Sequence, residues 1–518
     1  MTIRLLCLAA LALLAPQSPH AQQPASPAPA AAAPSAPAET AANTIRSTAR
    51  LVVLDMVVVD AKGNSVPDLK REDFHVTEAD ETQTVQNFEM PGTRAVGDDL
   101  AINSTAELDR LAPRAPVNII LLDEFNTRFE DMAFARYSLK KYLTKKESDK
   151  LSTPTMLIAV SIDNFTVLQD YTQSRAAILN ALDHHFAALP WRTQQNQWLA
   201  ERYATAFNTL RRVAQAVVGH PGHKNMIWVG RGFPSLNYAH ATVDSENRIF
   251  TAVQDCVDKL RDARVTLYTI DPAGISANVD AYGGDAELVD PFGGNYEFAK
   301  LAKATGGRTL YGRNDVDAEI GTAIRDGASF YTLTYRPTSE SYDPRKFRKI
   351  VVTVDRPGLK VITREGYYPQ GPPVRVNAEK PATRLVSDLM LANNSTMVYD
   401  GVPITVKPSP SEPGAFHIHV DARALNWSAA TDDKPRGAEI ILMVSTFDKK
   451  GKEIKHDANV LRVTAPRSDP PTGRLERPVE LPYKLPHDDK AVRVRFVVRV
   501  SSTGRIGTID LPLVAAKP

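Results

Sequence analysis

The residues whose types and order could support chemistry lie directly after a run of apolar residues. Val117 to Leu122 is almost wholly apolar, and it leads into Asp123, Glu124, Phe125, Asn126 and Thr127. A strand that is apolar on both faces is typical of a parallel sheet covered by helices on each side. Ligands of such sheets bind beyond the carboxyl ends of the strands. We therefore expect Asp123 at the mouth of a crevice, as a metal ligand or a nucleophile.

Three more charged residues follow predicted strands and could line the same crevice. Asp163 and Asp271 come directly after apolar runs, although a structural role is favoured for Asp163, and Asp271 precedes Pro272 in a sequence typical of a turn. Arg231 follows another apolar run. It could form an internal ion pair with Asp123, or it could be an exposed loop arginine.

The surrounding pattern predicts a doubly wound α/β domain over residues 115–328. Stretches with apolar residues at intervals of three and four alternate with short apolar strands, which is typical of βαβ units. We expect the strands at 117–122, 156–162, 226–229, 265–270 and 308–311.

The segments on both sides of this domain are strand-like. Residues 45–90 and 329–369 read as two parts of one β-sandwich into which the α/β domain is inserted. A polar linker is expected at 91–115. Residues 380–518 are β-rich and are predicted to form a second sandwich of immunoglobulin-like type.

The N-terminal residues predict export. A charged start followed by a short apolar run fits a signal peptide over residues 1–21, and residues 22–44 are a Pro- and Ala-rich segment expected to be a disordered linker. No later stretch is apolar enough to span a bilayer, so we expect a secreted, periplasmic or cell-envelope protein. The net charge of +2 is evenly mixed and gives no case for nucleic-acid binding.

Several separated segments resemble a known family. The order of elements after residue 117 is similar to a von Willebrand factor type A domain, which is a Rossmann-like fold. The flanking segments around residues 50–64, 66–74, 330–335 and 364–368 resemble those of secreted bacterial VWFA-related proteins. The resemblance covers about residues 45–370. It implies a protein-binding or adhesion role and a divalent cation, Mg²⁺ or Ca²⁺, held by oxygen ligands in a metal-ion-dependent adhesion site.

The chain departs from the family pattern at that site. Asp123 and Thr127 match metal-ligand positions, whereas Phe125 stands where the family has a hydroxyl. Arg231 stands near the place of a family Asp, and Thr193 is only a weak candidate for a further ligand. We therefore expect a degenerate metal site that keeps its shape, in which Asn126 could supply an amide oxygen.

The function expected from this resemblance is non-enzymatic. An unknown envelope or extracellular protein would bind a crown of residues at the strand ends, namely Asp123, Asn126, Thr127, Asp163 and Arg231. One alternative is a metal-assisted hydrolase that uses the same crevice, and another is an inert structural part of an envelope complex.

Other reactive residue types predict little chemistry. A phosphatase that uses Asp123 as nucleophile would need a second Asp at the position of Phe125 as general acid. The pairs at 184–185 and 220–223 are expected to be ordinary surface histidines, because no third zinc ligand has a recognisable spacing. Cys256 lies on a helical apolar stripe and is expected in the core.

Overall fold

The computed structural model describes most of the chain beyond residue 50. The described residues are 51–145, 150–161, 165–187, 195–230, 232, 243–273, 296–310, 313–338, 343, 346–369, 381–428, 430–431, 434–466, 475 and 477–513. The predicted signal peptide and linker lie outside them.

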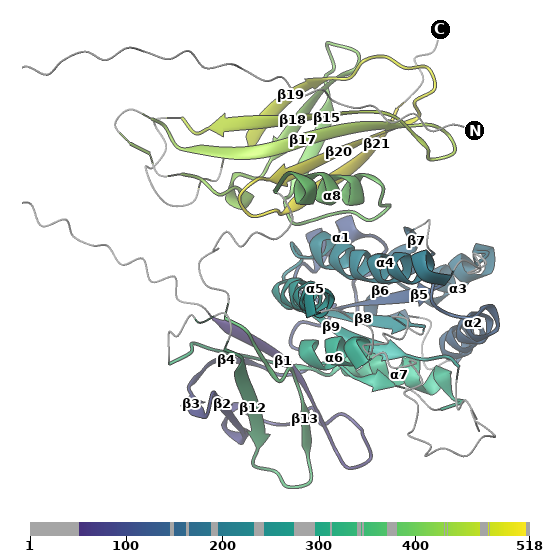
Figure 1. Cartoon of the computed structure of the whole chain (residues 1–518), viewed down its shortest axis with the longest axis vertical. Coiled ribbons are helices and arrows are strands. Elements are labelled where there is room, and N and C mark those ends of the chain that lie inside the picture. Colours follow the sequence, from purple (N-terminus) through teal and green to yellow (C-terminus); the bar gives the residue numbers. More distant parts are fainter. Residues whose placement is uncertain are drawn as a thin grey trace, which may run out of the picture. The chain divides into compact units, whose positions relative to one another are not determined.

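A sheet of six described strands forms the centre of the α/β region (Figure 1). Its strand order is β10-β9-β8-β5-β6-β7, and all neighbours are parallel except β7, which runs antiparallel to β6. The strands are β5 (Val117–Asp123), β6 (Lys150–Val160), β7 (Phe165–Ser174), β8 (Lys224–Val229), β9 (Val265–Ile270) and β10 (Thr309–Leu310).

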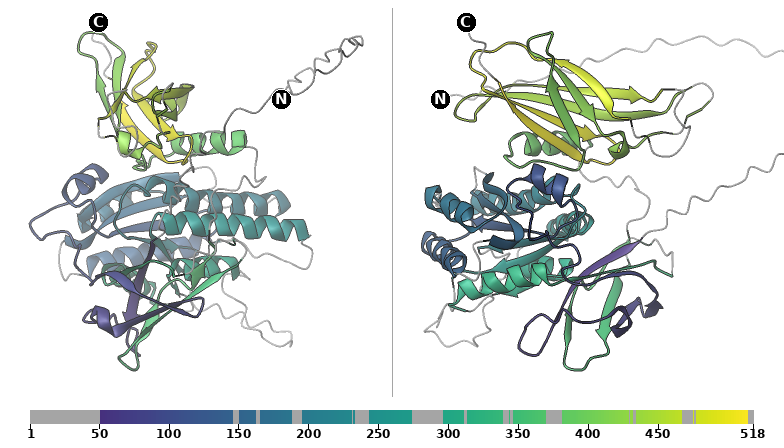
Figure 2. Two further views of the ribbon diagram at one scale, coloured as in Figure 1. Left: turned by 90° about the vertical axis from the view of Figure 1, so that its left-hand side faces the viewer. Right: turned by 180° about the vertical axis from the view of Figure 1, so that it is seen from behind.

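Helices cover both faces of this sheet, as Figure 2 shows. Every residue of β5 is buried, and its alternate side chains enter two different cores. Ile119 and Leu121 pack with α4 (Gln195–Ala216), α5 (Val243–Asp262) and α6 (Tyr296–Thr305). Ile120 and Leu122 pack with α2 (Phe129–Thr144), α3 (Arg175–His184) and α7 (Val316–Ala328). Burial on both faces explains why this strand is apolar at consecutive positions.

Strands from before and after the α/β region share two sheets, in the orders β13-β1-β11-β4 and β14-β12-β2-β3. β1 pairs antiparallel with β11, with Leu54 opposite Leu333. The elements are β1 (Val52–Val59), a 3-10 turn (Arg71–Asp73), β2 (Phe74–Glu78), β3 (Glu81–Gln83), β4 (Val85–Glu89), β11 (Tyr331–Tyr335), β12 (Arg348–Val354), β13 (Lys360–Ile362) and β14 (Gly366–Tyr367). Apolar side chains from both sheets form one core.

The C-terminal region contains two more sheets, in the orders β15-β16-β19 and β18-β17-β20-β21. Phe416, Ile418 and Phe496 belong to the core that these sheets share. The elements are α8 (Pro381–Asn393), β15 (Ile404–Pro408), β16 (Ala415–Val420), a 3-10 turn (Ala422–Ala424), β17 (Gly437–Phe447), β18 (Glu453–Thr464), β19 (Val479–Lys484), β20 (Arg493–Val500) and β21 (Ile506–Pro512).

Two helices lie where none was expected. The predicted polar linker contains α1 (Thr105–Leu111), whose first turn is capped by Ser104 Oγ accepting a hydrogen bond from the Glu107 backbone N–H over 3.2 Å. The Ser-x-x-Glu spacing is a helix-start signal that identifies this helix in retrospect. α8 begins a region predicted to be β-rich, and its Asp388 pairs with Arg499 of β20 at 2.9 Å. Among the described helices, none is long and apolar enough to cross a membrane.

Candidate functional site

Asp123 lies at the carboxyl end of β5, as predicted, but its carboxylate is enclosed. The residue is 0% exposed. Its Oδ1 accepts a hydrogen bond from the backbone N–H of Asn126 at 2.9 Å. Its Oδ2 accepts from the indole Nε1–H of Trp228 at 2.9 Å and from the backbone N–H of Gly232 at 3.0 Å. Trp228 in β8 and Gly232 after β8 thus supply two of the three donors to the carboxylate at the end of β5.

Gly230 closes over the same carboxylate. It has φ +149°, and a Cβ built on it would lie 2.4 Å from Asp123 Cβ and 2.6 Å from Thr127 Oγ1. Such distances leave no room for any side chain. A carboxylate at this position, where it would stand as a further metal ligand, cannot be accommodated without moving β5 and β8 apart.

The neighbouring crown residues are buried as well. Phe125, Asn126 and Thr127 are 1%, 4% and 2% exposed. The Phe125 ring meets the Trp228 indole edge to face, with centroids 6.2 Å apart. The expectation that Asp123, Asn126 and Thr127 form an open crown therefore does not match their burial, because Trp228, Gly230 and Gly232 pack against Asp123.

These residues fit a divalent cation poorly. The carboxylate oxygens of Asp123, which a cation would need as ligands, accept hydrogen bonds from three N–H groups. Gly230 packs directly against the same carboxylate. Within the parts of the chain that the structure describes, no group of three or more His, Cys, Asp or Glu side chains is placed to hold a metal ion. Asp163, Arg231 and Thr193 lie outside the described residues, so the proposed Asp123–Arg231 ion pair stays a prediction.

Asp271 follows β9 at the same edge of the sheet and makes a turn. It is 1% exposed, and its Oδ1 accepts from the backbone N–H of Ala273 at 3.0 Å, which is the side-chain-to-backbone bond of an Asx turn.

Glu319 in the first turns of α7 was not singled out from the sequence. Burial, followed by the negative charges of Asp315 and Asp271, raises the pKa of Glu319 to about 7.

A histidine tethers the loop that follows Asp123. Glu124 is 2% exposed, and its Oε1 lies 2.6 Å from Nε2 of His185 at the end of α3. Two exposed aromatic residues follow Glu124 and His185 closely in the sequence. Phe129 begins α2 and is 47% exposed, and Phe186 follows His185 and is 89% exposed. Large apolar side chains are thus presented beside the loop whose carboxylate is hidden.

The expectation that His220 and His223 lie on the surface is wrong, because they are 4% and 3% exposed. Both precede β8, so they lie at the amino ends of the parallel strands, whereas Asp123 lies at the carboxyl end of β5. His220 Nε2 lies 2.7 Å from the carbonyl oxygen of Ala115, and His223 Nδ1 lies 3.2 Å from Oδ2 of Asp55 in β1. Asp55 is brought to this position by the sheet that β1 shares with β11, a relation that local sequence does not show.

Asp55 is the centre of a part-buried charge cluster. Burial alone would raise the pKa of Asp55, but Arg264 and His223 outweigh it and hold the pKa below its usual range. Arg264 donates to both carboxylate oxygens, at 2.6 and 3.1 Å, from a backbone with φ +53°. The cluster joins β1 to the segment before β9.

Cys256 is 1% exposed in the core, as expected. Burial raises the pKa of its thiol to about 12. A thiol that stays protonated is a poor nucleophile.

Comparisons with known proteins add little to this description. No family profile and no curated protein matches the sequence. Among solved structures, the manganese-loaded TRAP protein of Plasmodium vivax is similar at 13% identity and a TM-score of 0.22, with 50% of this chain and 95% of that chain covered. The pilus adhesin SpaC of Lactobacillus rhamnosus GG is similar at 9% identity and a TM-score of 0.27, with 77% and 53% covered. Likenesses at these TM-scores carry no argument about fold or function.

Proposed function

We propose that this chain is an exported, non-enzymatic module of the von Willebrand factor type A kind that binds a protein partner without a bound cation. The proposal is supported by a mostly parallel sheet with helices on both faces and an Asp at the carboxyl end of a central strand. One observation carries the cation-independent part. The Asp123 carboxylate, where such a domain would bind its metal, accepts N–H donors from Asn126, Trp228 and Gly232.

A hydrolytic role for Asp123 finds less support. A nucleophile or base must reach its substrate, and a general acid must stand within hydrogen-bond reach. Asp123 is 0% exposed, and the residue two positions on is the buried Phe125. A rigid, enclosed carboxylate is better suited to hold the 124–128 loop in one conformation than to react.

The contact surface that we propose is the aromatic rim of this loop, defined by Phe129 and Phe186. Aromatic side chains are enriched among the residues that dominate protein–protein binding energy. Phe186 is 89% exposed and follows His185 in the sequence. The contact of His185 with Glu124 holds this end of α3 beside the loop. The buried crown would then act by positioning this rim.

The test compares binding of the exported chain and its variants to a partner isolated from envelope extracts and then purified. Phe186→Ala is expected to weaken binding about tenfold or more, as truncation of an interface aromatic does. Tyr137→Ala is a matched control, because Tyr137 is 62% exposed on α2, two turns beyond Phe129. Equal affinity of the Phe186→Ala variant and the wild type would contradict the rim.

The cation arm uses isothermal titration with Mg²⁺, Mn²⁺ and Ca²⁺, and partner binding with and without a chelator. We expect no saturable heat and no effect of the chelator. Loss of partner binding on chelation would overturn cation independence. Turnover of generic ester or phosphoester substrates by the wild type, lost in Asp123→Ala, would instead favour the hydrolase.

A further inference from the structure

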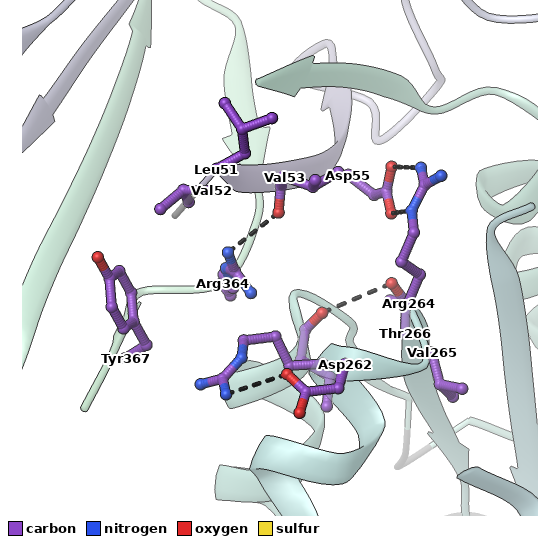
Figure 3. A pocket seen from close by; sticks show the side chains of 12 residues that line it. Leu51, Val52, Val53, Asp55, Asp262, Arg264, Val265, Thr266, Arg364 and Tyr367 are labelled. Carbon is purple, nitrogen blue, oxygen red and sulfur yellow. Dashed lines mark hydrogen bonds and ion pairs between the residues drawn. The ribbon is translucent and has the colours of Figure 1, made fainter. Parts of the chain in front are cut away.

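A cavity of about 280 Å³ lies beside the start of β9, at the opposite end of the parallel strands from Asp123. Figure 3 shows the residues that line it. One side is formed by β1 and the segment from β13 to β14, including Val53, Arg364 and Tyr367. The other side is formed by the end of α5 and the start of β9, including Arg261 and Arg264. The volume suits a small molecule rather than a protein segment.

Three guanidinium groups line this cavity, and two of them have carboxylate partners. Arg264 is paired with Asp55, at 2.6 Å between Nη2 and Oδ1. Arg261 is paired with Asp258 at 2.6 Å and with Asp262 at 3.2 Å. These contacts neutralise the charge of Arg261 and Arg264 within the protein itself.

Arg364 differs from both. It is only 9% exposed, and among the described residues no carboxylate lies within ion-pair distance of its guanidinium. Its Nη2 donates to the carbonyl oxygen of Val53 at 3.0 Å, and its buried Nε has no hydrogen-bond partner in the described part of the chain. Figure 3 shows Arg364 between Val53 and Tyr367, while the carboxylate of Asp55 is turned to Arg264.

The charge of Arg364 is retained at neutral pH. Burial, followed by repulsion from Arg261, lowers the pKa of Arg364 to about 10, which is still well above 7. A buried charge without a counterion is strongly unfavourable, so such groups are normally paired. The cavity is therefore lined by a positively charged guanidinium, that of Arg364, which has no carboxylate partner among the described residues.

The remaining walls indicate what kind of anion fits. Tyr367 is near two of the guanidinium groups, with its ring centroid 5.9 Å from Cζ of Arg364 and 6.0 Å from Cζ of Arg261. Leu51 and Val265 add apolar surface. The planar fork of an arginine matches the two oxygens of a carboxylate. We propose that this cavity binds a small organic carboxylate, with its anionic group on Arg364 and its apolar part against Leu51, Val265 and Tyr367.

This site is independent of the aromatic rim, and it is tested by titrating the full chain at low ionic strength. The probes are benzoate, inorganic phosphate and chloride, followed by calorimetry. Benzoate is expected to bind saturably, and Arg364→Gln is expected to weaken it at least tenfold, since a hydrogen-bonded charge partner is lost. Arg356→Gln is the matched control and should bind as the wild type does, because Arg356 is an exposed arginine paired with Asp68 at 2.9 Å.

A second variant keeps the test decisive if Arg364→Gln does not fold. Leu51 is 52% exposed and lines the cavity, so Leu51→Glu would add a negative charge to the cavity wall without disturbing the core. We expect it to fold and to abolish benzoate binding. Absence of saturable benzoate binding to the wild type, tighter binding of phosphate than of benzoate, or unchanged binding in Leu51→Glu would each overturn the proposal.

Discussion

The indole Nε1–H of Trp228 donates a hydrogen bond to Oδ2 of Asp123 over 2.9 Å, across two neighbouring parallel strands. Both residues are 0% exposed. The carboxylate that an open site would offer to a ligand is thereby made part of the interior. Its first measurable consequence concerns stability rather than binding.

Replacement of Asp123 by Ala is expected to destabilise the fold. The N–H groups of Asn126, Gly232 and Trp228 would lose this acceptor in a buried place, at a cost of about 3–5 kcal/mol in the free energy of unfolding. Urea unfolding measures the change. Asp489→Ala is the control, because Asp489 is 92% exposed. A loss below about 1 kcal/mol in Asp123→Ala would contradict an interior role.

Gly230 permits the close approach of β8 to Asp123, so Gly230→Ala is expected to cost about 2–4 kcal/mol. The added Cβ would lie 2.4 Å from Asp123 Cβ, at a backbone φ of +149°. Gly63→Ala separates the two causes, because Gly63 has φ +82° with no atom within 4 Å of the added Cβ. That control should show only the backbone cost, about 1–2 kcal/mol. Equal losses in both variants would mean that the contact with Asp123 contributes nothing.

His220 should make the protein sensitive to mild acid. Burial, followed by the positive charge of Lys224, lowers the pKa of His220 from 6.5 to about 4. Between these values the unfolded chain takes up a proton that the folded chain does not, so the His220 contribution to stability is lost as the pH falls from 6.5 to 4. The linkage amounts to at most about 3 kcal/mol.

The measurement is the urea midpoint of wild type and His220→Gln at pH 7, 6 and 5. The difference between the two proteins should shrink as the pH falls. His487→Gln is the control, since the side chain of His487 is 80% exposed. A constant difference for His220→Gln would argue that the imidazole titrates normally.

Glu319→Gln is expected to stabilise the protein at alkaline pH. Neither carboxylate oxygen of Glu319 has a hydrogen-bond partner among the described residues, and the pKa of this group is raised to about 7. Because the folded pKa lies above the unfolded value of 4.5, ionisation costs stability as the pH rises from 4.5 through 7. The variant should gain about 1–3 kcal/mol at pH 8 and nothing at pH 4.

Thermal or urea unfolding at the two pH values checks this. Glu412→Gln serves for comparison, because Glu412 is exposed and paired with Lys484 at 2.6 Å. It should lose a little stability at pH 8, or none. A loss in Glu319→Gln at pH 8 would show that the ionised carboxylate is stabilised by the fold.

The loss of stability at acid pH should depend on Asp55. Its pKa is held below the usual range despite burial, because Arg264 and His223 favour the charged form. Because the pKa of Asp55 is lower in the folded chain than its unfolded value of 3.8, the ionised carboxylate stabilises the fold above pH 3.8. This stabilisation is lost as the pH falls below 3.8. Asp55→Asn should unfold more readily at pH 7 by about 1–3 kcal/mol, because it leaves the part-buried Arg264, whose side chain is 25% exposed, without its counterion. The deficit should narrow below pH 3.8, as acid titration followed by circular dichroism would show.

Local sequence was sufficient for the elements whose pattern reflects burial. β5 is apolar at consecutive positions because both of its faces are covered, and that requirement is written into its own residues. The position of Asp123 at the end of that strand followed directly. Cys256 was likewise predicted in the core from the spacing of its helical neighbours. The short helices α1 and α8 were missed, since one was read as a polar linker and the other as part of a β-rich region.

Only the tertiary structure decided what surrounds each charged group. Asp123 is closed off by Trp228 and Gly230, which lie more than a hundred residues away, and His223 is buried against Asp55 of a strand that precedes the whole α/β region. Within the described ranges Arg364 has no carboxylate partner, because Asp55 pairs with Arg264 instead. Burial and charge pairing depend on which strands become neighbours, and that arises from sheet pairing over long sequence distances. The chain alone therefore determined where a carboxylate would stand, and the packing of distant strands determined that it would face inward.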